Sequence, residues 1–301
     1  MPNAYFTISK PANDPFKGYL PGSPERAELK AELKRQSEQV VRIPLIIGGK
    51  EVWTDRTIKV TMPHDHQHVI AECCMAGEAE LKQAMADGFI DTATLQIDTR
   101  ESFPDQEKNR ARMRTHFAVG YFSAKRAIRV ALEAKEAWEE MPWEHRSAIF
   151  LKAADRITGP YRQVLNASTM LGQSKTVFQA EIDIAELADF LRFGVWSAQE
   201  IFKDQPLSTD GIWNRQDYRP LDGFICAITP FNFTSIGGNL PTAPAIVGNV
   251  ALWKPSRTAV LANYYYMKLL MDCGLPAGVI NFVPCDGADM SKYVIPHPKM
   301  A

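Results

Sequence analysis

The C-terminal part of the chain alternates short apolar runs with longer helical segments. Apolar runs over 223–228, 249–253 and 279–283 predict buried strands. Helical patterns over 237–248 and 258–273 lie between them. Short buried strands joined by single helices are typical of βαβ units, which form a parallel sheet. We therefore expect an α/β fold with flanking helices in this region.

The middle of the chain, from about residue 78 to residue 204, has helical periodicity. Apolar residues recur three and four positions apart over 144–158, which predicts an amphipathic helix. Gly159-Pro160 ends this helix and begins the next, and a long third helix is expected over 175–202. We expect the large apolar side chains of the third helix in the core: Phe178, Ile182, Ala185, Leu187, Phe190, Phe193 and Trp196.

The N-terminal residues predict an extended arm followed by a charged helix. Ser23-Pro24 combines a good N-cap with a proline at the first helical position, so the helix should begin there. The apolar run 42–47 predicts a strand that turns at Gly48-Gly49. Two further short strands or a hairpin are expected over 59–62 and 69–73.

Two segments differ from this pattern. Residues 91–114, inside an insertion-like stretch at 85–130, are polar and charged and predict an exposed loop. Polar and apolar residues alternate over 211–217 and 218–220, which predicts a two-stranded β ribbon within 206–222. This ribbon separates the helical part of the chain from the strand–helix alternation that follows.

Composition and charge exclude several classes of protein. The 34 basic and 35 acidic side chains give a net charge of −1, whereas nucleic-acid and anionic-membrane surfaces need an excess of Lys and Arg. No apolar run approaches the roughly 18 residues that a membrane span needs, and the first residues resemble neither a signal peptide nor a typical transit peptide. The five cysteines are scattered outside any CxxC pair, which favours a reducing intracellular compartment. We expect no nucleic-acid and no membrane partner.

Polar side chains follow the ends of two consecutive predicted strands. Asn232 comes just after the first strand, and Lys254 ends the second. Ligands bind at the carboxyl ends of parallel strands, so both side chains should face one crevice. The Asn232 amide could donate to a developing oxyanion, although capping of the next helix is the simpler interpretation of Asn232 alone. Lys254 could bind hydroxyls or phosphates, although a solvated lysine is also common at a strand exit.

Other candidate groups carry weaker signals. His64, His66 and His68 alternate and could chelate a metal, but a polar turn between two strands is the simpler interpretation. Glu181 and Asp183 lie too close in sequence to share a helix face, so we interpret them as surface or interhelical acids. The chain has no GxGxxG dinucleotide motif and no P-loop. We expect no metal site.

Several motifs around the strand ends resemble the aldehyde dehydrogenase superfamily. They are ITPFNFT at 228–234, GGNL at 237–240, APA at 243–245, GNV at 248–250 and LWKPS at 252–256. More narrowly, the chain is similar to the 1-pyrroline-5-carboxylate (L-glutamate γ-semialdehyde) dehydrogenases. That likeness is carried by GSPER at 22–26, FLKAAD at 150–155, GQSKT at 172–176, QAEID at 179–183, FLRF at 190–193, and GLP at 274–276 leading into NFVP at 281–284. The resemblance covers nearly the whole chain except 85–130.

The resemblance implies an aldehyde-dehydrogenase-like α/β fold with a Rossmann-type parallel sheet, truncated before the catalytic domain. It divides the chain into an arm and helical part of the NAD-binding domain (1–205), an oligomerisation-type ribbon (206–222) and the first βαβ units of the sheet (223–301). The implied reaction is the NAD-dependent oxidation of L-glutamate γ-semialdehyde to glutamate in proline degradation, through a covalent thiohemiacetal. The resemblance also implies a homo-oligomer joined through the ribbon, in the cytoplasm or, as for many eukaryotic members, the mitochondrial matrix.

Four residues match positions that have a role in this family. Asn232 matches the Asn that stabilises the oxyanion, and Lys254 matches the residue that holds the adenosine ribose hydroxyls of NAD. Thr229 and Ser256 match positions that lie along the cofactor. Arg257 departs from the pattern, because the subfamily usually has an acid there. An Arg near the ribose can accommodate a 2′-phosphate, so we expect some tolerance of NADP.

The second departure concerns the nucleophile. The general-base Glu and the nucleophilic Cys of the family come after the last residue of this chain, and none of its five cysteines lies in the matching context. Acyl transfer without a thiolate has no covalent step, so we expect no turnover by the 301-residue chain alone. The leading hypothesis is the N-terminal portion of a dehydrogenase. The alternatives are a non-catalytic relative that binds nucleotide or pairs with full-length subunits, and a metal-binding module built on the histidines.

Overall fold

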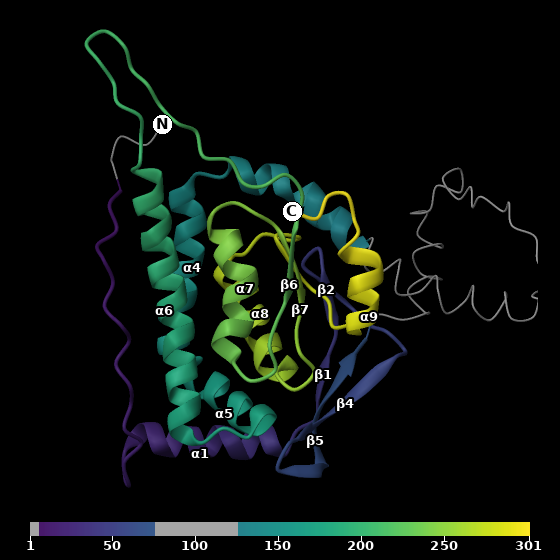
Figure 1. Cartoon of the computed structure of the whole chain (residues 1–301). Coiled ribbons are helices and arrows are strands. Elements are labelled where there is room, and N and C mark those ends of the chain that lie inside the picture. The colour runs from purple at the N-terminus through teal and green to yellow at the C-terminus, as the bar shows by residue number, and fades with distance from the viewer. Residues whose placement is uncertain (1–5, 76–125) are drawn as a thin grey trace, which may run out of the picture.

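The computed structural model describes residues 6–75 and 126–301, so the polar loop predicted at 91–114 lies outside the described residues. Its main sheet has five strands in the order β3-β2-β8-β7-β6, with helices packed around it (Figure 1). The strands of this sheet are β2 (Leu45–Ile47), β3 (Lys50–Val52), β6 (Ile225–Ile228), β7 (Ala251–Lys254) and β8 (Ile280–Phe282). The C-terminal strands therefore lie where the apolar runs predict them.

The main sheet combines parallel and antiparallel strands. β6, β7 and β8 are parallel, as the βαβ pattern predicts, whereas β2 runs antiparallel to both β8 and β3. The N-terminal pair is antiparallel because β2 and β3 form a hairpin. Its turn residues Gly48 and Gly49 have φ angles of 61° and 70°, the left-handed conformation that tight hairpin turns need. The Asn281 side chain on β8 accepts a hydrogen bond from the Gly48 amide at 2.9 Å, which joins the hairpin to the parallel strands.

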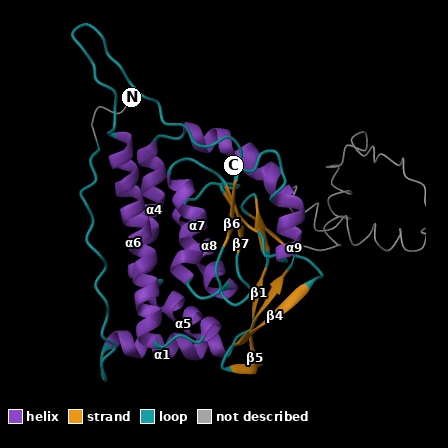
Figure 2. Ribbon diagram, viewed as in Figure 1, coloured by secondary structure: helices purple, strands orange, loops and turns teal. Residues whose placement is uncertain are grey.

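Helices surround the sheet close to their predicted positions (Figure 2). Their bounds are α1 (Pro24–Ser37), α4 (Trp143–Thr158), α5 (Arg162–Gln173), α6 (Val177–Phe202), α7 (Thr234–Ile246), α8 (Val260–Cys273) and the short α9 (Gly287–Asp289). Most of the burial expectations on α6 are wrong: Ala185 and Leu187 are buried, but Ile182, Phe190, Phe193 and Trp196 are only half-buried and Phe178 is 64% exposed. Phe178 lies in the first turn of the helix, where its ring packs edge-on against Phe16 of the N-terminal arm. Among the described helices, none is long and apolar enough to cross a membrane.

A second, three-stranded sheet follows the order β1-β5-β4. Its strands are β1 (Val41–Ile43), β4 (Thr57–Met62) and β5 (Asp65–Cys74), and β4 and β5 form the predicted antiparallel hairpin. The histidines at its turn make ordinary contacts. His64 Nδ1 lies 2.7 Å from Ser174 Oγ, and His68 Nε2 lies 2.6 Å from the Ser37 carbonyl oxygen. Within residues 6–75 and 126–301, no group of three potential metal ligands occurs.

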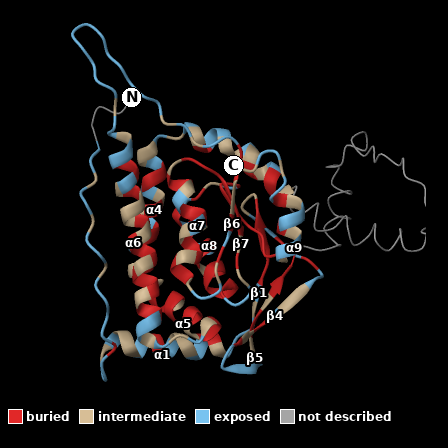
Figure 3. Cartoon of the chain, viewed as in Figure 1, coloured by how far each residue is buried: buried red, intermediate tan, exposed pale blue. Residues whose placement is uncertain are grey.

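Residues 206–222 form an extended loop rather than the predicted two-stranded ribbon. The described segment contains only one isolated bridge, between Thr209 and Ile212. The loop extends away from the body of the molecule (Figure 1) and is mostly exposed (Figure 3). A two-stranded hairpin without a neighbouring strand or helix is marginally stable, which accounts for the difference.

Candidate functional site

The ends of β6 and β7 meet at the same edge of the main sheet. Ile228 and Lys254 are paired across the two strands, and the Thr229 amide donates to the Lys254 carbonyl at 3.1 Å. β8 lies on the other side of β7, so the segment that contains Asp286 leaves the sheet at this edge too. The structure thus brings together the loops that carry Asn232, Lys254 and Asp286, as the strand pattern predicts.

The Lys254 ammonium is available to a ligand. The residue is half-buried at the end of β7. Among the described residues, its only hydrogen-bond partner is the Pro255 carbonyl oxygen, at the long distance of 3.5 Å. An ammonium carries three donors and no acceptor, so it fits vicinal hydroxyls or a phosphate.

The hydroxyl groups of Thr229 and Ser256 differ in whether they are free to bind a ligand. Thr229 is 5% exposed, and its hydroxyl donates to the Lys254 carbonyl at 3.4 Å and accepts from the Trp253 indole at 3.2 Å. Its side chain therefore holds the ends of β6 and β7 together. Ser256 is partly exposed, and its hydroxyl lies 3.4 Å from the Thr258 hydroxyl, a contact weak enough to leave it available to a ligand.

Asn232 does not cap the helix that follows it. The N-cap position of α7 is Phe233, which makes no side-chain cap hydrogen bond. The Asn232 side chain is exposed, and within the described part of the chain its amide has no hydrogen-bond partner. The capping interpretation is therefore wrong, and the amide can donate to a group outside the chain.

An acid on α6 caps α7 instead. The Asp183 carboxylate accepts hydrogen bonds from the backbone amides of Thr234 at 2.9 Å and Ser235 at 2.8 Å. Lys175 pairs with the same carboxylate at 2.8 Å and lies 4.0 Å from the centre of the Phe233 ring. Asp183 is fully buried, so this contact is part of the packing between two helices.

Both acids that the sequence suggested as ordinary surface or interhelical groups are fully buried. Glu181 and Asp183 are each 0% exposed. Asp183 binds the first turn of α7, and Glu181 binds Arg162 of α5 and the N-terminal arm. The interhelical interpretation is therefore confirmed and the surface interpretation is wrong, but the sequence did not identify the partners, which lie far apart in the chain. The available signal was that Phe233 begins α7 without a Ser, Thr, Asp or Asn cap.

A cluster of ion pairs lies at the same edge of the sheet as the end of β7. Asp286 accepts a hydrogen bond from Arg257 Nη2 with one carboxylate oxygen, and from Arg56 Nη2 at 2.5 Å with the other. Partial burial acts to raise the pKa of the Asp286 carboxyl, but the bonds and charges of the two arginines outweigh it and hold that pKa below its usual value. The carboxylate is therefore ionised at neutral pH.

Comparison with known proteins places this arrangement in a family. The model described as the aldehyde dehydrogenase family matches residues 106–301. The chain belongs to the aldehyde dehydrogenase family. The match confirms the resemblance found at the strand ends of this chain.

Three relatives show which members of the family the chain is similar to in sequence and structure. The Delta-1-pyrroline-5-carboxylate dehydrogenase of Agaricus bisporus is 44% identical over 299 residues, which are 98% of this chain and 46% of that protein. The human enzyme of the same name is 40% identical over 279 residues, 92% of this chain and 42% of that protein. The NAD-bound structure of the Mycobacterium tuberculosis enzyme has a TM-score of 0.82 at 42% identity, covering 99% of this chain and 48% of that one. The chain therefore spans just under half the length of these relatives.

Four of the five cysteines of this chain are not activated. All five lie within the described residues and are free thiols, and all but Cys226 are buried. Burial raises the pKa of Cys73 and Cys285 to about 12 and that of Cys226 to about 11. Burial also raises the pKa of Cys273. Thiols with such pKa values are protonated at neutral pH, so none of these four fits a catalytic nucleophile.

Proposed function

We propose that this chain supplies the adenosine-binding and oxyanion-stabilising groups of an NAD-dependent dehydrogenase that oxidises L-glutamate γ-semialdehyde to glutamate in proline degradation. The observation that carries the proposal is the pair Asn232 and Lys254. Lys254 is the last residue of β7, and Asn232 follows the end of the adjacent parallel strand β6. Neither side chain has a strong hydrogen-bond partner within the described part of the chain. The identity to relatives named Delta-1-pyrroline-5-carboxylate dehydrogenase supports the choice of substrate.

The residues at the sheet edge fit the adenosine half of NAD. When bound, NAD would accept the hydride that the aldehyde loses. The Lys254 ammonium donates to the ribose hydroxyls, and the Ser256 hydroxyl lies within the same loop to add a second donor or acceptor. Thr229 keeps the ends of β6 and β7 in register and so fixes the position of Lys254.

Asn232 acts on the aldehyde oxygen. Addition of a thiolate to the carbonyl moves negative charge onto that oxygen, and a preplaced amide N–H stabilises the charge. Asp183 holds the first turn of α7, which begins two residues after Asn232, and so limits where the amide can lie. No cysteine of this chain is assigned the role of the nucleophile.

NAD is the proposed cofactor, and NADP is the second candidate because of Arg257. A guanidinium close to the ribose can bind a 2′-phosphate. Arg257 is three positions beyond Lys254 and its side chain is 59% exposed.

We also propose that residues 206–222 join two copies of this chain. Leu207, Ile212 and Trp213 are 90%, 58% and 78% exposed, which is unusual for large apolar side chains on one loop. A second copy would present the same loop, so the contact would be self-complementary. The free thiols support a reducing compartment, either the cytoplasm or the mitochondrial matrix.

Calorimetric titration of the chain with NAD tests the cofactor site. We expect Lys254→Met to weaken NAD binding at least tenfold, since the ammonium is the main donor to the ribose. Lys268→Met is the matched control, because Lys268 is an exposed lysine on α8 that pairs with Glu51. Equal effects of the two substitutions, or no binding of NAD by the unmodified chain, would contradict the proposal.

A further inference from the structure

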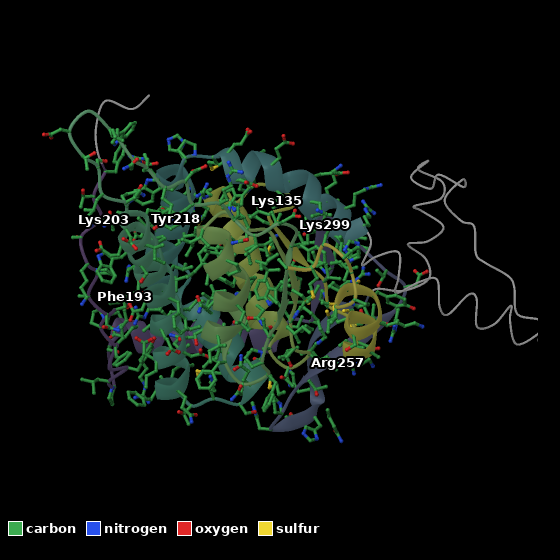
Figure 4. All side chains as sticks on the ribbon, turned by 45° about the horizontal axis from the view of Figure 1, so that its top comes forward. Lys135, Phe193, Lys203, Tyr218, Arg257 and Lys299 are labelled. Carbon is green, nitrogen blue, oxygen red and sulfur yellow. The ribbon has the colours of Figure 1, made fainter. Side chains whose placement is uncertain are left out.

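The proposed function leaves one feature of the sheet edge unused. Asp286 follows β8 and forms ion pairs with Arg257, which follows β7, and with Arg56, which lies before β4. Figure 4 labels Arg257 on the side of the molecule where the yellow helix α9 lies. One carboxylate thus occupies two guanidinium groups at the carboxyl edge of the sheet.

We propose that Asp286 sets the dinucleotide preference of this chain by occupying the Arg257 guanidinium and keeping the 2′-phosphate of NADP away from it. The inference rests on the proposed dinucleotide site at Lys254. It makes the role of Arg257 depend on Asp286, which follows the neighbouring strand β8. It also reverses the simplest expectation from Arg257 alone, which is tolerance of NADP.

The charged groups lie close enough to act on one another. β7 and β8 are adjacent and parallel, so their carboxyl ends are neighbours. Arg257 follows Lys254 by three residues and forms an ion pair with Asp286, which follows β8. Lys254, Arg257 and Asp286 therefore lie on the two neighbouring segments that leave the sheet at the proposed ribose site.

Asp286 disfavours a 2′-phosphate in two ways. A carboxylate and a phosphate compete for the same planar guanidinium donors, so the phosphate must displace Asp286 before it can bind Arg257. The ionised carboxylate also repels a phosphate that lies within the screening distance of about 8 Å at physiological salt. The 2′-hydroxyl of NAD is uncharged and meets neither penalty.

The ion pair between Arg257 and Asp286 is exposed enough for a ligand to reach it. The side chains of Arg257 and Asp286 are 59% and 31% exposed, so solvent and a nucleotide can reach them. Removal of the carboxylate would leave both arginines in place without their shared partner. The site would then carry an excess of positive charge beside Lys254, which favours a 2′-phosphate.

Two mononucleotides test the inference without turnover. Adenosine 5′-monophosphate and adenosine 2′,5′-bisphosphate contact only the adenosine half of the site and differ by the 2′-phosphate. We expect Asp286→Asn to raise the affinity for the bisphosphate, relative to the monophosphate, about tenfold in calorimetric titration at low salt, where charge effects are least screened. The double substitution Asp286→Asn with Arg257→Gln should return the ratio to that of the unmodified chain.

Asp222→Asn is the matched control. Asp222 is an exposed acid that pairs with Lys299, and its substitution changes the net charge by the same amount as Asp286→Asn does. An unchanged ratio in Asp286→Asn, or an equal gain in Asp222→Asn, would overturn the inference. Arg257→Gln alone provides a test that does not depend on the folding of Asp286→Asn. It should lower bisphosphate affinity less than about twofold, and a tenfold loss would show that Arg257 already serves a 2′-phosphate.

The two proposals fail in different ways. If the monophosphate binds and Lys254→Met weakens it, while Asp286→Asn leaves the ratio unchanged, the role of Asp286 is wrong and the dinucleotide site stands. If the unmodified chain binds neither mononucleotide, the dinucleotide site is wrong and the role of Asp286 falls with it.

Discussion

Asp183 Oδ2 lies 2.9 Å from the backbone nitrogen of Thr234, so a buried side chain of α6 caps the first turn of α7. Lys175 neutralises the carboxylate at 2.8 Å. The start of α7 is thereby fixed to the longest helix described. Because Asn232 lies just before this turn, the packing of two helices determines where the candidate oxyanion donor lies.

Substitution of Asp183 should destabilise the fold. We expect Asp183→Asn to lower the free energy of unfolding by about 3 kcal/mol, since it leaves the Lys175 ammonium without its buried partner and weakens the helix cap. Urea denaturation followed by circular dichroism measures the change. Asp155→Asn is the control, because Asp155 pairs with Arg192 at the surface and its side chain is 78% exposed. Equal stabilities of the two variants would contradict the role of Asp183.

Asn232 should affect the rate and not the binding of the cofactor. A chimera that joins this chain to the part of the Agaricus bisporus relative that it does not cover provides an assay of NAD reduction. We expect Asn232→Ala to lower kcat by about 10²–10³-fold, as the loss of an oxyanion donor does, while NAD affinity stays unchanged. Asn232→Asp should lower kcat further, because a carboxylate repels the developing charge. A variant with normal kcat would exclude the oxyanion role.

Strand and helix positions were predictable because they depend on local periodicity. The apolar runs predict β6, β7 and β8, and the alternation with helices predicts their parallel order. The shared edge of Asn232 and Lys254 follows from that order alone. Local rules therefore suffice for the backbone that carries the site.

Contacts between distant segments were not predictable. The cap of α7 comes from Asp183, some fifty residues earlier in the chain, and the partner of Arg257 comes from the end of another strand. Neither relation leaves a periodic signal. The exposure of Phe178 was likewise not predictable, because the helical pattern does not show how little of this side chain the N-terminal arm covers.

Close packing of three helices predicts an effect of a single methyl group. A Cβ at Gly238 on α7 would lie 2.7 Å from atoms of both Leu187 on α6 and Tyr266 on α8. We expect Gly238→Ala to lower the free energy of unfolding by about 1–3 kcal/mol, as overpacking of a core does. Gly287→Ala is the control, since nothing lies within 4 Å of a Cβ there. Thermal unfolding of both variants decides the prediction, which fails if Gly238→Ala is as stable as Gly287→Ala.

Exposed apolar side chains on the 206–222 loop should drive self-association. We expect the double substitution Leu207→Ser with Trp213→Ser to shift the chain towards the monomer in sedimentation velocity, because it removes the two most exposed large apolar groups of the loop. Phe178→Ser, at a similarly exposed site on α6, is the control and should leave the distribution unchanged. A monomer in all three proteins would exclude this contact.

The buried Glu181 ties the N-terminal arm to the helices. Its carboxylate accepts hydrogen bonds from the Lys17 amide and the Tyr19 hydroxyl, both at 2.7 Å, and forms an ion pair with Arg162. Burial acts to raise the pKa of Glu181, but the Arg162 guanidinium and these donors outweigh it and lower that pKa below its usual value of 4.5. The ionised form is thus the one that the fold stabilises.

Stability should therefore fall with acid in a way that depends on Glu181. A lowered carboxyl pKa contributes stability above the unfolded value of 4.5, and the contribution disappears as the pH falls through the folded value. We expect Glu181→Gln to be less stable than the unmodified chain by about 3 kcal/mol at pH 7, because Arg162 loses its fully buried partner and keeps only Asp14 as an acidic partner among the described residues. The difference should begin to shrink below pH 4.5 and disappear below the lowered folded pKa, where both proteins carry a neutral group at position 181. Urea titrations across this pH range measure it, and a difference that stays constant into acid would show that the charge of Glu181 does not hold the arm.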